Sequence, residues 1–275
     1  MKNCYVFISD NNCKDYLQIS LRSFMLTHPR YEVLVYTKDI VDLNIDGVKQ
    51  CKILDIPHIE NDIPQLTVPN LDLLSYRLKI LEDIKNEYDK IMMLDTDMIF
   101  LENIDELFDI SEDCIEGVNE LDSHIYYRNV FKLPLWYNAK CYLNSGMLVI
   151  PTTLLRKYNI LEDYKNELNI RSEYYICPEQ DYINYKFKDN LLSIPRIYNC
   201  VVGTTNDLTG NAKVIHYCGN GKPLRNANPL LMLAAKSFYD VFDFFIDKFK
   251  DHLSTYFYQA NKEILLSRNV FLNNL

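Results

Sequence analysis

Residues 88–101, YDKIMMLDTDMIFL, contain an apolar run of the length of a buried strand, and the run ends abruptly at Asp95-Thr96-Asp97. Two carboxylates in so apolar a segment need a cationic partner, because burying one ionised carboxylate without a partner costs several kcal/mol. Ligands of open α/β sheets bind at the carboxyl ends of the strands, so an Asp-x-Asp pattern at such an end predicts a metal site. A simple turn is the alternative interpretation, because Asp is common in turns.

The composition is that of a globular protein and narrows the choice of partners. The 275 residues, 48% hydrophobic and 24% charged, suffice for one large α/β domain. The formal charge is −9 and the Lys and Arg residues are scattered, which argues against binding to nucleic acid. No apolar run approaches the ~20 residues of a transmembrane helix, and the N-terminus becomes polar after Ile8. We therefore expect neither a membrane span nor a secretory signal.

Cysteine and glycine usage limits the chemistry further. The eight cysteines include no Cys-x-x-Cys pair and several lie in apolar runs, which favours reduced, buried thiols and a cytoplasmic location over disulfides or a zinc site. The seven glycines form neither a Gly-x-Gly-x-x-Gly pattern nor a Walker-type loop. If the protein binds a nucleotide, a metal ion and a lysine have to hold the phosphates.

The apolar periodicity predicts strands and helices in alternation. Strands are expected at residues 4–9, 32–36, 51–54, 114–118, 147–150, 191–195 and 212–217. Helices are expected around 17–25 and ending before Pro29, at 71–85, at 104–108, from Thr152 as N-cap to about residue 169, and from Pro178 onward. Residues 122–140 are interpreted as an aromatic-rich insertion that carries the only tryptophan.

The pattern becomes helical after residue 227. Phe238, Phe242, Phe245 and Phe249 recur at helical spacing, with acidic residues between them. Membrane-surface helices favour Lys and Arg on the polar face, so docking on the main domain or on a second subunit is the better interpretation. We expect a main domain at 1–227, a C-terminal helical extension at 228–275, and a homodimer.

A second metal-capable side chain, His216, ends the apolar run at 214–216. A lone histidine is more often structural, but a glycine-containing segment with Lys222 follows immediately and suits a phosphate ligand. Two carboxylates and one imidazole, with positions left for diphosphate oxygens, suit Mn²⁺ best and Mg²⁺ second. Asp95, Asp97 and His216 are therefore the expected metal ligands.

Four motifs stand in one order along the chain: Asp-Thr-Asp, Asn-Ser-Gly at 144–146, Glu-Gln-Asp-Tyr-Ile-Asn at 179–184, and His-Tyr-Cys-Gly-Asn-Gly-Lys-Pro at 216–223. In this order and spacing they resemble glycosyltransferase family 8, the family of glycogenin, over residues 4–223. The resemblance implies an α/β fold of the GT-A type, a Rossmann-like mixed sheet flanked by helices, here with the C-terminal helical extension. It also implies a UDP-sugar donor, Mn²⁺ and retention of the anomeric configuration.

The resemblance also implies roles for individual residues. Glu179 and Gln180 match a pair beside the anomeric carbon of the donor, and Lys222 matches a diphosphate contact, so these three are the expected catalytic residues. Arg77 falls where the family has a basic residue that reaches the donor, although a solvated helix charge is an equal alternative. The full expected donor set is Ile8, Ser9, Asn11 and Tyr16 near uracil and ribose; Arg77, Asp95, Thr96, Asp97, Asn144, Ser145, Glu179 and Gln180 near the metal and sugar; and His216, Gly219 and Lys222 near the diphosphate.

Two departures from the family pattern concern the substrates. Glu179 stands where the family usually has Asp, and residues 201–213 lack the tyrosine that glycogenin glucosylates on itself. Our hypothesis is a Mn²⁺-dependent retaining hexosyltransferase for which UDP-glucose is the favoured donor. The protein itself or a glucan primer is among the acceptors. UDP-galactose with a polyol or glycan acceptor and a non-catalytic UDP-sugar-binding scaffold are the alternatives. A sugar-nucleotide phosphohydrolase would need a water-activating base, for which the sequence offers no clear candidate.

Overall fold

The protein is described by a computed structural model that covers residues 2–10, 13–28, 32–37, 49–52, 71–130, 138–201 and 211–218. All of these except Val201, Tyr217 and Cys218 belong to one compact unit, made of Met1–Cys200 and Asp207–His216. The expected donor residues Asn11, Gly219 and Lys222 and the expected extension at 228–275 lie outside the described residues. The domain boundary at residue 227 therefore stays a prediction.

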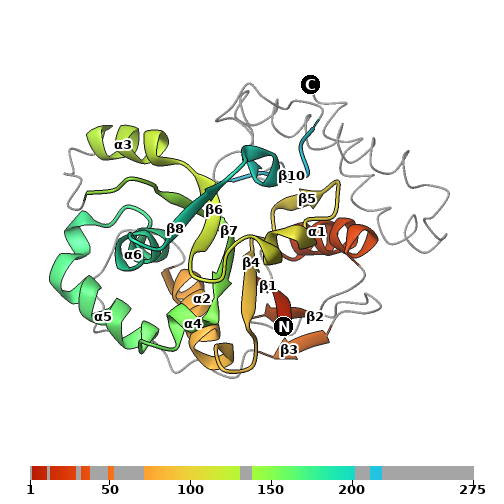
Figure 1. Ribbon diagram of the computed structural model, residues 1–275, viewed down its shortest axis with the longest axis horizontal. Coiled ribbons are helices and arrows are strands. Elements are labelled where there is room, and N and C mark those ends of the chain that lie inside the picture. Colours follow the sequence, from red (N-terminus) through yellow and green to blue (C-terminus); the bar gives the residue numbers. More distant parts are fainter. Residues whose placement is uncertain are drawn as a thin grey trace. The chain divides into compact units, whose positions relative to one another are not determined.

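A seven-stranded mixed sheet forms the centre of this unit, in the order β3-β2-β1-β4-β7-β6-β8 (Figure 1). Strands β1 to β4 run parallel to their neighbours in this group, whereas β7 is antiparallel to both β4 and β6. Strand β8 is parallel to β6. The bounds are β1 Asn3–Ser9, β2 Glu32–Thr37, β3 Lys49–Lys52, β4 Lys90–Leu94, β6 Ile115–Asn119, β7 Leu143–Pro151 and β8 Leu191–Ile194.

A smaller sheet, in the order β5-β10-β9, begins directly after the Asp-Thr-Asp turn. Its strands are β5 Met98–Phe100, β9 Cys200–Val201 and β10 Val214–His216. The apolar run at 88–101 is thus two strands in different sheets, separated by the turn. Antiparallel pairing of β5 with β10 sets His216 opposite Met98, the residue that follows Asp97. This register brings two distant parts of the chain together at the end of β4.

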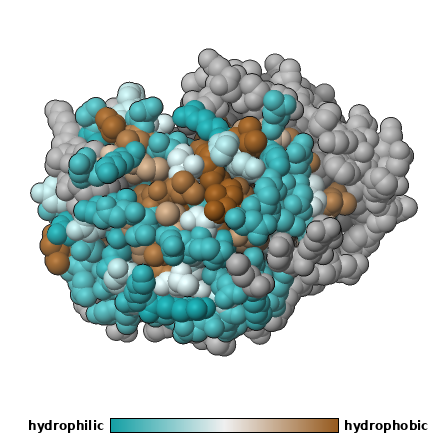
Figure 2. Space-filling model, in the orientation of Figure 1, coloured by the Kyte–Doolittle hydropathy of each residue, from teal (hydrophilic) through white to brown (hydrophobic). Residues whose placement is uncertain are grey.

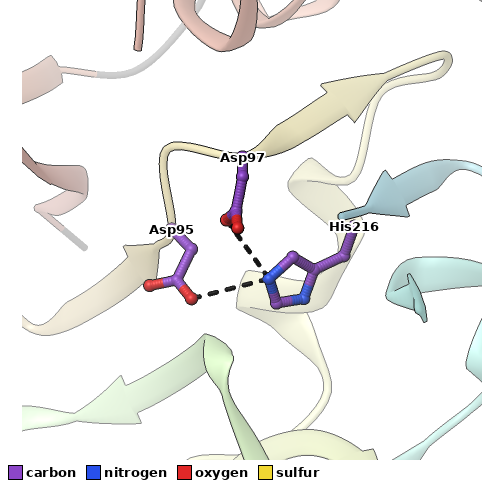
Figure 3. Close-up of side chains that lie close together, drawn as sticks. All are labelled: Asp95, Asp97 and His216. Carbon is purple, nitrogen blue, oxygen red and sulfur yellow. Dashed lines mark ion pairs between the residues drawn. The ribbon is translucent and has the colours of Figure 1, made fainter. Parts of the chain in front are cut away.

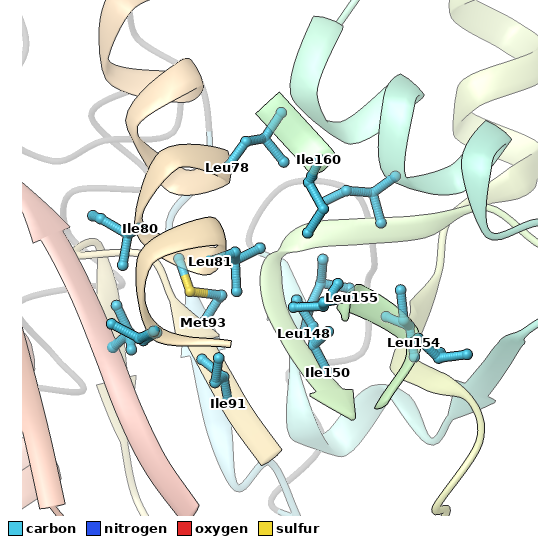
Figure 4. Close-up of a cluster of buried hydrophobic side chains, with 14 of the residues drawn as sticks. Leu78, Ile80, Leu81, Ile91, Met93, Leu148, Ile150, Leu154, Leu155 and Ile160 are labelled. Carbon is cyan, nitrogen blue, oxygen red and sulfur yellow. The ribbon is translucent and has the colours of Figure 1, made fainter. Parts of the chain in front are cut away.

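Apolar cores cover both faces of the main sheet, because strand side chains alternate between the faces. Ile91 and Met93 of β4 belong to the core formed with α2, α4, α5 and α6, part of which is shown in Figure 4. Met92 and Leu94 belong to the opposite core, formed with α1 and the 3₁₀ helix η2. The helices are α1 Lys14–Thr27, α2 Leu71–Ile84, α3 Leu121–Val130, α4 Thr152–Leu155, α5 Ile160–Arg171 and α6 Pro178–Lys186, with 3₁₀ helices η2 Asp105–Asp109, η3 Ser172–Tyr174 and η4 Arg196–Tyr198.

The expected start of the strand at 147–150 is wrong. Strand β7 begins at Leu143, so Asn144, Ser145 and Gly146 lie inside the strand rather than before it. Their polar groups are compatible with a buried strand because other side chains satisfy them, as described below. Part of the expected insertion at 122–140 is the helix α3, which begins at Leu121.

The prediction that Thr152 caps a long helix is wrong. Its hydroxyl donates instead to the carbonyl oxygens of Tyr88 at 2.7 Å and Asp89 at 3.1 Å, and α4 ends after four residues. A separate helix, α5, follows, and its N-cap is Asn159, whose side chain accepts a hydrogen bond from the Glu162 N–H at 3.3 Å. Thr152 therefore connects the end of β7 to the segment before β4.

On the face shown in Figure 2 the described residues are mostly hydrophilic, and hydrophobic residues gather near the middle. None of the helices in the described ranges is long and apolar enough to cross a membrane. Seven of the eight cysteines in these ranges, all except Cys51, are recorded as free thiols, and of these seven Cys4 and Cys200 are buried.

Candidate active site

The expected metal ligands converge at the junction of the two sheets (Figure 3). Asp95 and Asp97 come from the turn between β4 and β5, and His216 comes from the end of β10. The imidazole Nε2 lies 3.5 Å from Asp95 Oδ2 and 3.3 Å from Asp97 Oδ1. One ligand atom from each residue lies within 4.8 Å of the others, so the three could hold a metal ion.

The pKa of His216 shows that the carboxylates of Asp95 and Asp97 favour a positive charge between them. Burial alone lowers the pKa of His216, but the carboxylates of Asp97 and Asp95 outweigh it and raise that pKa to about 9. Nε2 is buried and makes no well-directed hydrogen bond with another described residue. A divalent cation fits this place, because carboxylate oxygens and an imidazole nitrogen are established ligands for such ions.

Gly146 explains why the Asn-Ser-Gly motif accompanies the histidine. A Cβ atom at Gly146 would lie 2.3 Å from Cε1 of His216 and 2.8 Å from Oδ1 of Asn144. The carbonyl oxygen of Gly146 accepts a hydrogen bond from the backbone N–H of Asp95 at 2.8 Å, which ties β7 to the turn. The absent side chain therefore leaves the space that the imidazole ring occupies.

Arg77 of α2 is buried against the same turn, with 6% of its surface exposed. Its guanidinium donates to Asp95 Oδ1 at 3.0 Å and to the carbonyl oxygen of Ser145 at 2.5 Å, and its Nε lies 3.7 Å from Glu179 Oε1. Burial lowers the pKa of Arg77, but the carboxylates of Glu179 and Asp95 raise it overall. The alternative of a solvated helix charge is thus wrong.

Gln180 of α6 is held at both ends of its amide. Its Oε1 accepts from the backbone N–H of Ser145 at 2.7 Å, and its Nε2 donates to the hydroxyl of Tyr142 at 3.1 Å. Tyr142 in turn donates to Asp181 Oδ1 at 2.7 Å. The neighbouring carboxyl of Glu179 is buried, which raises its pKa against the opposing effect of Arg77. The amide and the carboxyl are therefore fixed beside the Arg77 guanidinium.

The structure brings together most of the expected site residues that it describes. Ile8 and Ser9 end β1, next to the turn, because Phe7 pairs with Leu94 in the parallel register of β1 and β4. Tyr16 is buried in α1 and Thr96 is buried in the turn. The residues joined through contacts around Arg77, Ser145 and the cluster are Arg77, Asp95, Asp97, Asn144, Ser145, Glu179, Gln180 and His216.

Sequence reasoning missed several residues that hold this site. Asn199 and Glu120 lie behind His216, Asp181 and Tyr142 lie behind Gln180, and Gly146 makes room for the ring. Glu120 could have been identified from the sequence, because it follows the predicted strand at 114–118 as Asp95 follows β4. Asn199 could not, because no motif surrounds it.

The fold and the cluster of Asp95, Asp97 and His216 define a class of protein, an α/β domain with an Asp-x-Asp turn at the end of a central strand. The family model for glycosyl transferase family 8 matches residues 27–227. The chain belongs to glycosyl transferase family 8, and the expected class of enzyme, a glycosyltransferase, is confirmed at the level of the family.

Curated relatives cover parts of the chain. Galactinol synthase 3 of Arabidopsis thaliana is 30% identical over 167 residues, which are 50% of this chain and 47% of the relative. An uncharacterized protein, R707, of Acanthamoeba polyphaga mimivirus is 28% identical over 218 residues, 74% of each chain. The chain therefore spans about half the length of the galactinol synthases that it matches.

Solved structures show the same fold. The galactosyltransferase LgtC in complex with donor and acceptor sugar analogues aligns with a TM-score of 0.61 at 18% identity, over 85% of this chain and 95% of that chain. The glycosyltransferase GlyE of Streptococcus pneumoniae aligns with a TM-score of 0.60 at 16% identity, over 88% and 64%. The expected α/β fold of the GT-A type is thereby confirmed.

Proposed function

We propose that this protein is a metal-dependent glycosyltransferase that moves a hexose from a UDP-hexose to an acceptor with retention of the anomeric configuration. The observation that carries the proposal is the cluster of Asp95, Asp97 and His216, whose ligand atoms lie within 4.8 Å of one another at the end of β4. Mn²⁺ is the favoured ion and Mg²⁺ the second, because the ligands mix carboxylate oxygen with imidazole nitrogen. Membership of family 8 supports the nucleotide-sugar donor.

The residues around the cluster would hold the donor. When bound, the divalent ion would neutralise charge that develops on the diphosphate as the sugar leaves. Arg77 supplies a buried, permanently charged guanidinium beside the turn, suited to a phosphate or sugar oxygen. Gly219 and Lys222, which follow β10, would contact the diphosphate, and Lys222 would stabilise the leaving group.

Gln180 and Glu179 would face the sugar. Glu179 would accept hydrogen bonds from sugar hydroxyls, and Gln180 would lie beside the anomeric carbon. An amide is a weak nucleophile, which fits a retaining transfer in which the acceptor attacks from the face that the diphosphate leaves. Hydrogen bonds from Ser145 and to Tyr142 keep the Gln180 amide from rotating, so it would meet the donor in one orientation.

Two donor and acceptor pairs are worth testing. UDP-glucose with a glycogenin-like primer role is the first candidate, and it rests on the order of the four motifs. UDP-galactose with a polyol acceptor is the second, supported by the relatives named for the synthesis of galactinol. A cytoplasmic location and a homodimer formed through residues 228–275 complete the proposal.

The test combines donor choice with loss of the metal site. Purified protein is incubated with Mn²⁺, either UDP-sugar, and a glucan or polyol acceptor, while UDP release and intact protein mass are followed. Asp97→Ala should lower turnover by ~10²-fold or more, by analogy with the loss of one oxyanion donor. The control is Asp83→Ala, which removes an exposed carboxylate on α2 that pairs with Lys79.

The outcomes separate the alternatives. Hexose increments on the protein would support the primer role, and UDP release that depends on an added acceptor would support a small acceptor. Unchanged transfer in Asp97→Ala or with a chelator would refute the metal assignment. Tight binding of UDP and Mn²⁺ without transfer or hydrolysis of any donor would favour the non-catalytic scaffold.

A further inference from the structure

A chain of side-chain hydrogen bonds leads away from the metal cluster behind His216. The Nδ1 atom of His216 lies 3.0 Å from Asn199 Oδ1. Asn199 Nδ2 donates to Asn144 Oδ1 at 2.9 Å, and Asn144 Nδ2 donates to Glu120 Oε2 at 2.9 Å. The histidine and both asparagines are buried, whereas Glu120 is partly exposed. The chain therefore connects the ring nitrogen that faces away from the cluster to a carboxylate at the surface.

The direction of each bond follows from the outer end of this chain. A carboxylate only accepts hydrogen bonds, so Asn144 has to turn its NH₂ group toward Glu120. The backbone N–H of Gly146 independently donates to Asn144 Oδ1 at 2.9 Å and requires the same orientation. Asn199 then presents its NH₂ group to Asn144 and its oxygen to His216. An oxygen acceptor at this place requires a hydrogen on Nδ1 of His216.

We propose that Asn199 is a positioning residue for the metal site, because it accepts the Nδ1–H hydrogen bond of His216 and so keeps the Nε2 lone pair directed at an ion held by Asp95 and Asp97. The inference rests on the metal-dependent function proposed above. Histidine ligands commonly donate their second ring N–H to an oxygen acceptor, and loss of that acceptor lowers metal affinity by ~10–100-fold. Asn144, expected from the sequence to contact sugar, also serves the metal site through Asn199.

Two substitutions at one position separate hydrogen bonding from packing. Asn199→Ala removes the acceptor, whereas Asn199→Asp keeps an oxygen for Nδ1–H but loses the NH₂ group that faces Asn144. A positioning role predicts a Mn²⁺ dissociation constant ~10–100-fold higher in Asn199→Ala and most of the affinity restored in Asn199→Asp. A merely structural role predicts that Asp is at least as harmful as Ala, because its carboxylate would face the oxygen of Asn144 inside the protein.

The readouts are Mn²⁺ affinity by electron paramagnetic resonance in the presence of UDP, and the visible spectrum of bound Co²⁺, which reports nitrogen ligation. Asn184→Ala is the matched control, because this buried asparagine bonds the backbone of Leu143 at 2.6 and 2.8 Å and serves α6 and β7. It should lower the unfolding temperature and leave the Mn²⁺ affinity within about 3-fold of wild type. If Asn199→Ala does not fold, Glu120→Ala against Glu120→Gln tests the partly exposed end of the same chain, and only the alanine should weaken Mn²⁺ binding several-fold.

The results distinguish this inference from the proposed function. A wild-type protein that binds no Mn²⁺, with or without UDP, and transfers sugar in a chelator would refute the metal-dependent function itself. Normal Mn²⁺ binding by wild type with equal affinity in Asn199→Ala, or weaker binding in Asn199→Asp than in Asn199→Ala, would overturn only the role of Asn199.

Discussion

Gly146→Ala should displace His216 from the candidate metal site without replacing any of the three expected ligands. The added Cβ would lie 2.3 Å from Cε1 of His216 and 2.9 Å from its Nδ1, whereas ordinary contact begins near 3.4 Å. The backbone of Gly146 is held by the Asp95 N–H and by Oδ1 of Asn144. The ring therefore has to move, by about 1 Å, and a metal–nitrogen bond tolerates only about 0.2 Å.

A displacement of this size is equivalent to losing the ligand. We expect the Mn²⁺ dissociation constant of Gly146→Ala to rise ~10²-fold, or about 3 kcal/mol, toward that of His216→Ala. Calorimetric titration with Mn²⁺ in the presence of UDP measures this. Gly117→Ala is the matched control, because its Cβ would meet Leu148 Cδ2 at 2.8 Å, the flexible end of a side chain in the core of the sheet.

A double-mutant cycle makes the test specific. Both glycine variants should lose ~1–3 kcal/mol of stability through crowding, but Gly117→Ala should keep its metal affinity. In the His216→Ala background there is no ring to displace, so Gly146→Ala should cost almost no further metal affinity. Additive losses in the double variant, or a folded Gly146→Ala that binds Mn²⁺ like wild type, would refute the steric reasoning.

Three further predictions concern residues around the site and in the core. Burial raises the pKa of Glu116 from 4.5 to about 7, against the opposing effect of Lys90, so the contribution of this carboxyl group to the stability of the fold falls as the pH rises from 4.5 through 7. Glu116→Gln does not titrate at this position. The difference in unfolding free energy between the variant and wild type, measured in urea, should therefore shift by about 3 kcal/mol in favour of the variant between pH 4 and pH 8. A difference that stays the same at both pH values would contradict this. Arg77→Lys cannot replace all three guanidinium contacts and should lower the unfolding free energy by ~1–3 kcal/mol, whereas Lys79→Ala, on the surface of the same helix, should change it by under ~0.5 kcal/mol. Thr152→Val loses the buried hydrogen bond from the Thr152 hydroxyl to the carbonyl oxygen of Tyr88, in the segment before β4, and should lower the unfolding free energy in thermal unfolding by ~1–2 kcal/mol. Thr152→Ser, which keeps the hydroxyl, should lower it by less.

Much of the fold could be predicted because its main strands are covered on both faces. Such strands are nearly continuous apolar runs, and the runs at 4–9 and 32–36 predict strands for this reason. The start of β7 was missed because Asn144 and Ser145 are polar. Their partners, Asn199, Glu120 and Gln180, lie far away in the sequence, and only the folded chain shows that a buried strand can carry them.

The candidate metal ligands could be predicted for a different reason. Asp95, Asp97 and His216 each stand where an apolar run ends, and the ends of strands are where side chains converge. That the three side chains lie close together depends on the register of β5 with β10, which cannot be predicted from any local sequence pattern. Asn199 is even harder to predict from the sequence, because its proposed contact with His216 forms only once that register has placed the imidazole beside it.

A metal ion bound at the junction of the two sheets would link metal affinity to local stability. Strand β10 pairs with β5 over only three residues, and pairing this short contributes little stability alone. An ion shared by the turn and His216 would hold the end of β10 against the turn that follows β4, and a ligand at 100 times its dissociation constant adds about 2.7 kcal/mol to the state that binds it. The same linkage works in reverse, because any change that frees the imidazole also weakens the hold on the ion. Gly146 and Asn199, behind the ring, would therefore act on the same free energy as Asp97 in front of it.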